Sequence, residues 1–204
     1  MTKCKFAFFD FDDTLLPKDS MGRLVLFCIK KHPLSFICLF PLAFYSILYG
    51  LKIIDFIPLK EKLLFPLKFC SMQELNEFYQ LVLIPHYYSN VVKTLLNRKK
   101  EGYLIWLVSA SPEVYLQFTD LPVDQIIGTK TEIRAGKPTN KIISKNCKGE
   151  EKVQRIQALL KEQQLEIDYE NSCGYSDSTS DLPMLKLVKN RIRISKKDGS
   201  MSPF

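Results

Sequence analysis

The most constraining feature of this sequence is a short apolar and aromatic run, residues 5–9, that ends directly in an acidic turn beginning Asp10-Phe11-Asp12. An unbroken apolar run of this length is typical of a strand that is buried on both faces, as in a parallel sheet. The next such run, residues 103–108, follows a polar-faced helical pattern over residues 91–99 and then Gly102. Helix, glycine and strand in this order favour an α/β fold.

The rest of the chain repeats this alternation. It predicts strands over residues 123–128, 171–175 and 191–194, a hairpin over 129–143, and helices over 149–165 and 182–188. Ser111 followed by Pro112 is typical of a helix start, with the serine as the cap. The alternation predicts a mostly parallel sheet with helices on both faces.

A long insertion follows the first predicted strand. Residues 18–85 are rich in Leu and Phe, and prolines divide them at positions 33, 41, 58 and 66. We therefore expect an all-helical cap over residues 18–85, inserted into a core made of residues 1–17 and 86–204. A chain of 204 residues has room for one such domain with its insertion.

Chemically active residue types stand where the predicted strands end. Asp10 and Asp12 follow the first strand, Ser109 follows the second, and Asp177 follows a later one. Ligands of open parallel sheets bind at the carboxyl ends of the strands. Asp10 and Asp12, two residues apart on a tight turn, can turn one carboxylate and one backbone carbonyl to the same ion, and Asp177 adds another carboxylate. Such a set suits Mg²⁺.

The same residues suit phosphoryl transfer. Asp10 can attack phosphorus as the nucleophile, which forms an aspartyl phosphate, and Asp12 can act as the general acid and base. Ser109 with its neighbouring backbone amides, and the cation of Lys152, can stabilise the phosphoryl oxygens. Lys137 also follows a glycine in a predicted loop, so the choice between Lys152 and Lys137 stays open.

These residues resemble the motifs of the haloacid dehalogenase-like hydrolases, which are Asp-nucleophile phosphatases with a Rossmann-like core, over nearly the whole chain. The first motif, Asp-x-Asp-x-Thr, matches Asp10, Asp12 and Thr14, and the second, a Ser or Thr, matches Ser109. The first motif implies that Asp10 is the nucleophile, Asp12 the acid/base residue and Thr14 a structural hydroxyl, and Lys152 fits the lysine of the third motif. The resemblance also implies substrate binding by Thr14, Ser109, Ala110 and Lys152. In the fourth motif it implies a metal ligand at Asp177 and a supporting carboxylate at Asp181. It also implies Mg²⁺ as the cofactor and a phosphate ester as the substrate.

A helical cap between the first and second motifs resembles the phosphoserine phosphatase branch of this family. Phosphoserine phosphatases usually carry Gly-Asp-Gly-x-x-Asp at the fourth motif, whereas residues 174–181 read Gly-Tyr-Ser-Asp-Ser-Thr-Ser-Asp. That form is similar to the phosphatidylglycerophosphatase members, which implies a lipid phosphate. The alternatives are a soluble ester such as a phosphoserine-like compound, and a non-catalytic membrane adaptor on the same scaffold. Dehalogenation is disfavoured, because it needs no acid or base at Asp12.

The charge pattern of the cap agrees with a lipid partner. The net charge is +7, and residues 18–68 contain eight basic against three acidic residues. Within them, residues 34–51 carry no charge and are flanked by Lys30, Lys31 and Lys52. An apolar stretch with a basic rim is typical of a surface that meets anionic lipid. Nucleic acid is not expected as a partner, because it favours basic residues interleaved with polar ones.

A helix of this length would reach about 27 Å, close to the hydrocarbon thickness of a bilayer. A single crossing is excluded, because Asp10 precedes the stretch and Asp177 follows it, yet both must bind one metal. We expect an interfacial segment or a shallow hairpin that turns near Pro41 or Gly50, on the cytoplasmic face, with lysines among the headgroups, namely Lys30, Lys31, Lys52, Lys60 and Lys62. The alternative is that the stretch packs on the core or on a second subunit, as in a homodimer.

The cysteines favour a cytoplasmic location. All six lie far apart without a Cys-x-x-Cys pair, at positions 4, 28, 38, 70, 147 and 173. We therefore expect neither a zinc site nor a disulfide framework, and we expect a reducing compartment.

Overall fold

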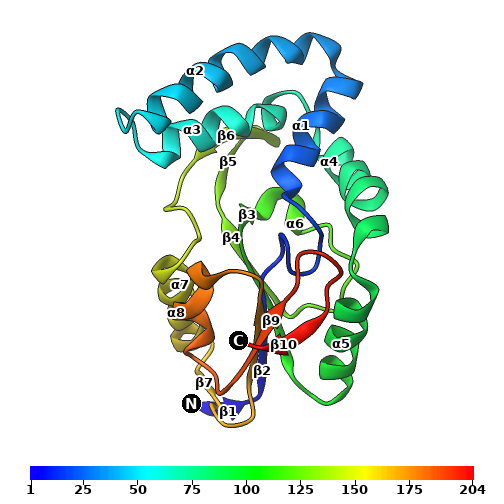
Figure 1. Cartoon of the computed structure of the whole chain (residues 1–204), viewed down its shortest axis with the longest axis vertical. Helices are drawn as coiled ribbons and strands as arrows, with labels where there is room; N and C mark the ends of the chain where they lie inside the picture. Colours follow the sequence, from blue (N-terminus) through cyan, green and yellow to red (C-terminus); the bar gives the residue numbers. More distant parts are fainter.

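The computed structural model describes all 204 residues and has a mostly parallel sheet at its centre (Figure 1). Its strands run in the order β10 (Met201–Pro203), β9 (Asn190–Ile194), β8 (Cys173–Ser176), β2 (Phe6–Phe9), β3 (Leu104–Pro112) and β4 (Gln125–Thr129). Only the β10–β9 pair is antiparallel. The predicted α/β fold is confirmed.

Two smaller sheets accompany the central one. β1 (Thr2–Cys4) pairs in parallel with β7 (Leu165–Ile167), and β5 (Thr131–Arg134) forms the predicted hairpin with β6 (Lys137–Ile142). The strands β1, β7 and β10 were not predicted. Each has three residues, which is too short for a periodic pattern.

Strand β2 separates two hydrophobic clusters because its side chains alternate between the faces of the sheet. Phe6 and Phe8 pack with Trp106 against α7 (Glu150–Glu162) and α8 (Leu182–Leu185). Ala7 and Phe9 belong to the other cluster, which includes residues of α5 (Ser89–Lys100). Helices therefore cover both faces, as Figure 1 also shows.

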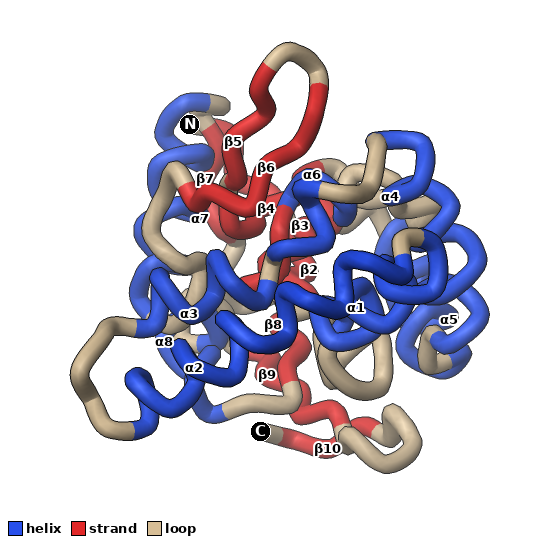
Figure 2. The backbone as a smooth tube through the Cα atoms, turned by 90° about the horizontal axis from the view of Figure 1, so that it is seen from above, coloured by secondary structure: helices blue, strands red, loops and turns tan.

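All the regular elements between β2 and α5 are helical, and they lie over the carboxyl ends of the strands (Figures 1 and 2). The elements are α1 (Ser20–Lys31), η1 (Pro33–Cys38), α2 (Leu39–Gly50), α3 (Phe56–Leu63), η2 (Phe65–Lys68), α4 (Met72–Phe78), η3 (Tyr79–Leu83) and η4 (Ile84–His86). The four dividing prolines all stand within the first turn of an element, where no N–H donor is needed. They mark helix starts.

Helix α2 contains no buried residue, and most of its side chains are exposed. The helical stretch Pro33–Gly50 is long and apolar enough to cross a membrane, and only 6 % of it is buried. The chain reverses after Gly50, so that α3 packs back against α2 (Figure 1). Both ends of the stretch thus return to the same side.

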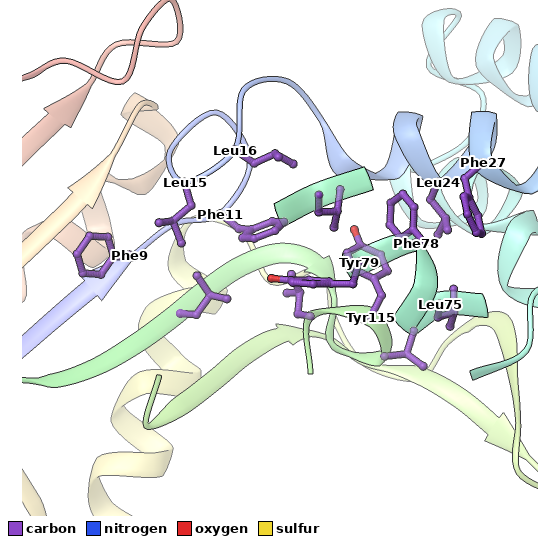
Figure 3. Packing of buried hydrophobic residues seen from close by; sticks show 14 of the residues in the cluster. Phe9, Phe11, Leu15, Leu16, Leu24, Phe27, Leu75, Phe78, Tyr79 and Tyr115 are labelled. Atoms are coloured by element: carbon purple, nitrogen blue, oxygen red, sulfur yellow. The ribbon is translucent and has the colours of Figure 1, made fainter. Parts of the chain in front are cut away.

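The cap and the core share one hydrophobic cluster. Figure 3 shows its side chains in a continuous row from Phe9 and Phe11, at the end of β2, to Leu24 and Phe27 of α1 and Phe78 of α4. All these side chains are buried. The packing fixes α1 and α4 relative to the turn that carries Asp10.

Candidate active site

Asp10, Lys152 and Asp181 form a buried ion cluster at the carboxyl end of β2. The backbone N–H of Asp10 donates to the carbonyl of Tyr175 at 3.0 Å, which places the carboxylate between β2 and β8. Lys152, in the first turn of α7, brings its Nζ to 2.8 Å from both Asp10 Oδ1 and Asp181 Oδ2. Ser176 Oγ donates to the same Asp181 oxygen at 2.7 Å. One ammonium is therefore shared by two carboxylates.

The structure distinguishes between Lys152 and Lys137, the two lysines that the sequence left as alternatives for the phosphate contact. Lys137 is exposed at the turn of the β5–β6 hairpin, whereas the Lys152 side chain is 2 % exposed and touches Asp10. Lys152 is the lysine that the fold brings to the predicted nucleophile.

The Asp12 carboxylate is held on both of its oxygens. Oδ1 accepts from the backbone N–H of Ser20 at 2.7 Å, and Oδ2 accepts from the Ser111 hydroxyl at 2.5 Å. Ser20 begins α1, so the first turn of the cap contacts the predicted acid/base residue directly. Its hydroxyl also lies 3.0 Å from that of Ser111 and 2.8 Å from that of Tyr115.

The prediction that Ser111 caps a helix is wrong. Strand β3 continues to Pro112, and the short helix α6 (Glu113–Leu116) begins after it without a side-chain cap. The Ser111 hydroxyl binds Asp12 instead. The sequence analysis missed this role because the Ser-Pro pair has the pattern of a helix start.

Thr14 links the turn after β2 to the loop after β8. Its Oγ1 donates to Asp177 Oδ1 at 3.2 Å and accepts from the backbone N–H of Asp177 at the same distance. The residue is fully buried. Its hydroxyl therefore links two loops, as implied for a structural hydroxyl, and its substrate contact stays a prediction. Asp177 Oδ2 also lies 2.9 Å from the Nζ of Lys196, which sequence reasoning did not single out.

Ser109 and Ala110 lie in an irregular part of β3. Val108 pairs with Ile127 and Pro112 with Thr129, so the chain bulges out of the β3–β4 ladder between these pairs. Bulges of this kind turn backbone and side chains toward nearby sites. Ser109 is buried, and its Oγ accepts from the Ser111 N–H at 3.0 Å. The bulge thus places both predicted phosphate contacts beside the residue that binds Asp12.

Burial dominates the electrostatics of these carboxyls. It raises the pKa of Asp10 to about 7, since the loss of water outweighs the attraction of Lys152, and the Asp181 charge adds to the rise. Burial also raises the pKa of Asp12 to about 6, with the Asp19 charge adding and the bonds from Ser111 and Ser20 opposing. Burial acts to lower the pKa of Lys152, but the charges of Asp10 and Asp181 outweigh it and raise that pKa.

The donor set has the chemistry of a site for a hard divalent cation. The buried carboxyls of Asp10 and Asp181 share the single ammonium of Lys152, so the cluster can accept more positive charge. No three Asp, Glu, His or Cys side chains gather closely enough to hold a metal by themselves. The expected donors are the carboxylates of Asp10 and Asp177 and the backbone carbonyl of Asp12. In this structure both carboxylate oxygens of Asp12 and both of Asp177 contact protein groups.

A parallel sheet with carboxylates and a buried lysine at its carboxyl edge, closed by a helical insertion, defines an α/β protein with a site for polar chemistry. The chain belongs to the haloacid dehalogenase-like hydrolase family, whose model matches residues 7–186. The predicted resemblance to this family is confirmed, and with it the prediction of a hydrolase.

Several solved structures share the fold. A protein described as having unknown function, from Bordetella pertussis Tohama I, is 26 % identical over 95 % of this chain and 91 % of that chain, with a TM-score of 0.79. A substrate-bound phosphoserine phosphatase is 16 % identical over 95 % and 87 %, with a TM-score of 0.65. A phosphoserine phosphohydrolase-like protein from Francisella tularensis is 19 % identical over 93 % and 95 %, with a TM-score of 0.60.

Proposed function

We propose that this protein hydrolyses phosphate monoesters through an aspartyl phosphate on Asp10, with Mg²⁺ as its cofactor. The observation that carries the proposal is the pair of contacts from Lys152 Nζ to Asp10 and Asp181, beside an Asp12 carboxyl that Ser111 and Ser20 hold in place. The nucleophile and the acid/base residue thus come from the turn after β2 and the cation from α7, and all three meet at one strand end. The phosphoserine phosphatases of the same fold support this reaction class.

The reaction divides into two displacements. Asp10 attacks phosphorus, the bond from phosphorus to the ester oxygen breaks, and Asp12 gives its proton to the departing alkoxide. Asp12 then takes a proton from water, the water oxygen attacks phosphorus, and the Asp10 carboxylate leaves. A pKa of about 6 lets Asp12 both give and take a proton near neutral pH. Bound Mg²⁺ supplies positive charge to the phosphoryl oxygens, and the Ser109 hydroxyl and Lys152 contribute hydrogen bonds and charge from the protein side.

The test compares wild type with the variant Asp10→Asn. The wild type should release p-nitrophenol from p-nitrophenyl phosphate only when Mg²⁺ is present. During turnover, peptide mass mapping should find a hydroxylamine-sensitive phosphate on Asp10. Asp10→Asn should lose both signals while its circular dichroism spectrum stays unchanged. Hydrolysis retained by that variant would refute the assignment of Asp10.

We further propose that the ester belongs to a lipid, of the phosphatidylglycerol phosphate type, in an anionic membrane. The support is an exposed apolar surface on the cap, which we call the apolar ridge. Each of its side chains is at least half exposed: Leu34, Phe36, Ile37, Phe40, Phe44, Ile47, Leu51 and Ile53. An apolar patch of this extent marks an interaction surface.

Charge complementarity selects the bilayer as the occupant of the ridge. Lys30 and Lys52 are exposed and flank the stretch in the sequence, and the Nζ of Lys62 lies 4.7 Å from the centre of the Tyr45 ring of α2. The expectation that Lys60 joins these headgroup lysines is wrong, because its side chain is fully buried. A rim of cations around an uncharged ridge fits anionic headgroups above hydrocarbon.

The α2–α3 hairpin favours a monotopic arrangement. The apolar helical stretch Pro33–Gly50 has the length to cross a bilayer, so its connections to the rest of the chain decide how it lies. Since α1 and α3 both lead back to the core, the ridge enters one leaflet and the chain does not cross. The proposal includes a peripheral location on the cytoplasmic face of the cell membrane, for which the free state of all six cysteines is the support.

Flotation with vesicles tests the lipid partner. Wild type should float with phosphatidylglycerol-containing vesicles, and the double variant Phe40→Asp, Phe44→Asp should remain at the bottom. Leu81→Asp, which charges an apolar side chain that is equally exposed outside the ridge, is the matched control and should float. A wild type that stays at the bottom and sediments as a dimer, with the double variant monomeric, would show that the ridge is a subunit interface and that the substrate is a soluble ester.

A further inference from the structure

Lys60 of α3 is a buried cation that the proposed reaction does not use. Its side chain is fully buried, and its Nζ donates three hydrogen bonds to the core. The acceptors are the Ala110 carbonyl at 2.6 Å, Thr129 Oγ1 at 3.0 Å and Asn146 Oδ1 at 2.6 Å. All three are neutral oxygens, and burial lowers the pKa of Lys60 to about 8.

Burying an ammonium group among neutral oxygens is unfavourable in free energy, so it is a poor way to attach a helix. Removing a charge from water is unfavourable unless an opposite charge meets it, and apolar replacements of buried ions often stabilise a protein. Helix α3 already has other attachments. Glu61 accepts from the Ile142 N–H at 2.9 Å, and its carbonyl accepts from Asn140 Nδ2 at 2.7 Å. The position of α3 therefore does not depend on Lys60 alone, and the buried charge needs another explanation.

The contact of Lys60 with Ala110 supplies that explanation. The Ala110 carbonyl lies in the bulge of β3 and accepts from both Lys60 and the Thr129 hydroxyl, the latter at 2.6 Å. Two donors on one carbonyl fix the peptide plane that joins Ala110 to Ser111. The N–H of that peptide donates to Ser109 Oγ, and the hydroxyl of Ser111 donates to Asp12. A short chain of contacts thus runs from the cap to the acid/base residue.

We propose that Lys60 is a positioning residue, which holds the Ser109–Ala110–Ser111 bulge in its reactive geometry only while the cap is docked on the core. The inference rests on the proposed function of the same site. In this arrangement the cap contributes a cation, Lys60, that binds the backbone of the phosphate-binding segment. When α3 moves away, the Ala110 carbonyl loses its charged donor and keeps only the Thr129 hydroxyl, so the bulge that carries Ser111 is held less firmly.

Steady-state kinetics on p-nitrophenyl phosphate test this role. Lys60→Met, which keeps the length and removes the charge, should lower kcat by about 10- to 100-fold, because small misplacements of reacting groups cost that much. KM should change by less than about threefold, since the substrate contacts remain. Lys60→Arg should recover part of kcat. Lys93→Met, at an exposed lysine of α5, is the matched control and should behave as wild type.

Amide hydrogen exchange provides a readout that does not require turnover. In Lys60→Met the peptide that covers residues 109–112 should exchange at least about tenfold faster than in wild type, while peptides of β2 stay unchanged. Thr129→Val should have the same effect in smaller degree, and adding it to Lys60→Met should add little, because both residues act on one carbonyl.

The outcomes separate this inference from the proposed function. A wild type without phosphatase activity refutes the proposed function, and faster exchange of residues 109–112 in Lys60→Met would still support the positioning role. An active wild type with unchanged kcat and unchanged exchange in Lys60→Met overturns the inference alone. A rise in KM with constant kcat would overturn it as well, because it would show that Lys60 binds substrate.

Discussion

The strand-end cluster around Asp10 and the apolar ridge of the cap depart from ordinary protein structure in opposite ways. In the cluster, charged groups are buried: Asp10 is 8 % exposed, and Lys152 and Asp181 are 2 % exposed. On the ridge, large apolar groups are exposed: Leu34 is 84 % and Phe40 is 68 % exposed. Charged residues are rarely buried without partners, and extended apolar patches are rarely left in water.

The difference shows how each region obtains its stability. The buried charges are matched inside the chain, because Lys152 meets two carboxylates and Asp12 accepts two hydrogen bonds. The ridge has no such match within the chain, since α2 contains no buried residue. The cluster finds its partners within the chain apart from the proposed cation, whereas the ridge has none within the chain and is the surface for which we propose a bilayer. Chemistry and attachment thus occupy opposite sides of the cap, and each can be altered separately.

The largest effect is expected at Lys152. Replacing it by Met leaves Asp10 and Asp181 buried without their cation, which should lower the free energy of unfolding by about 3 to 5 kcal/mol. Hydrolysis of p-nitrophenyl phosphate should fall by about 10³-fold, because a preorganised charge at the reacting group is lost. Urea denaturation and initial-rate kinetics measure the two effects.

A second substitution shows whether lost pairing is the cause. Adding Asp10→Asn to Lys152→Met removes one of the unpaired charges and should restore part of the stability, but none of the activity. Lys189→Met, which breaks an exposed ion pair with Glu170, should leave the unfolding curve unchanged. If Lys152→Met is as stable as wild type, Lys152 does not compensate the buried charges of Asp10 and Asp181.

Sequence reasoning succeeded where the physical signal is local. The buried strand at residues 5–9 and the acidic turn after it follow from an apolar run and its polar end, and the structure places β2 there. The β5–β6 hairpin follows from Ala135-Gly136, and both residues adopt positive φ. In these segments the local pattern and the fold agree.

It failed where a role depends on distant partners. Lys60 looks like any lysine of a basic cap, and nothing near it in the sequence indicates that its Nζ reaches Ala110, 50 residues away. Ser111 has the local pattern of a helix cap, yet its partner Asp12 is 99 residues away. Such contacts arise only when distant segments of the chain come together in the fold, so a single sequence does not show the pairing.

The next largest effect is expected for a variant of the apolar ridge, whose activity on a soluble and on a lipid substrate should change by different amounts. The double variant Phe40→Asp, Phe44→Asp should hydrolyse p-nitrophenyl phosphate at the wild-type rate, because neither side chain is part of the strand-end cluster. Its hydrolysis of phosphatidylglycerol phosphate in vesicles should fall by about 100-fold or more, since each buried aromatic side chain contributes about 1.5 to 3 kcal/mol of apolar transfer. Equal losses on both substrates would show that the ridge also supports the fold of the site.

A smaller effect is expected at the link between the loops. Thr14→Val keeps the shape of the side chain but leaves Asp177 without the Thr14 hydroxyl, which should cost about 1 to 2 kcal/mol of stability. The Mg²⁺ concentration for half-maximal activity should rise by about tenfold, because Asp177 is no longer held beside the Asp10 turn. Thr14→Ser, which keeps the hydroxyl, should stay near wild type. An unchanged Mg²⁺ requirement in Thr14→Val would argue against Asp177 as a ligand.

The smallest effect concerns the rim of the ridge and depends on salt. Lys52, exposed just after α2, should lie at headgroup level when the ridge enters a leaflet. A lysine near an anionic surface contributes about 1 kcal/mol to binding, so Lys52→Gln should weaken flotation with phosphatidylglycerol vesicles by about fivefold. The loss should shrink in 0.5 M salt, because screening shortens the reach of the charge. On pure phosphatidylcholine vesicles, wild type and variant should bind equally, since the apolar contribution is the same. A Lys52→Gln effect that persists in high salt would place this lysine in a protein contact, and the ridge would then be a subunit interface.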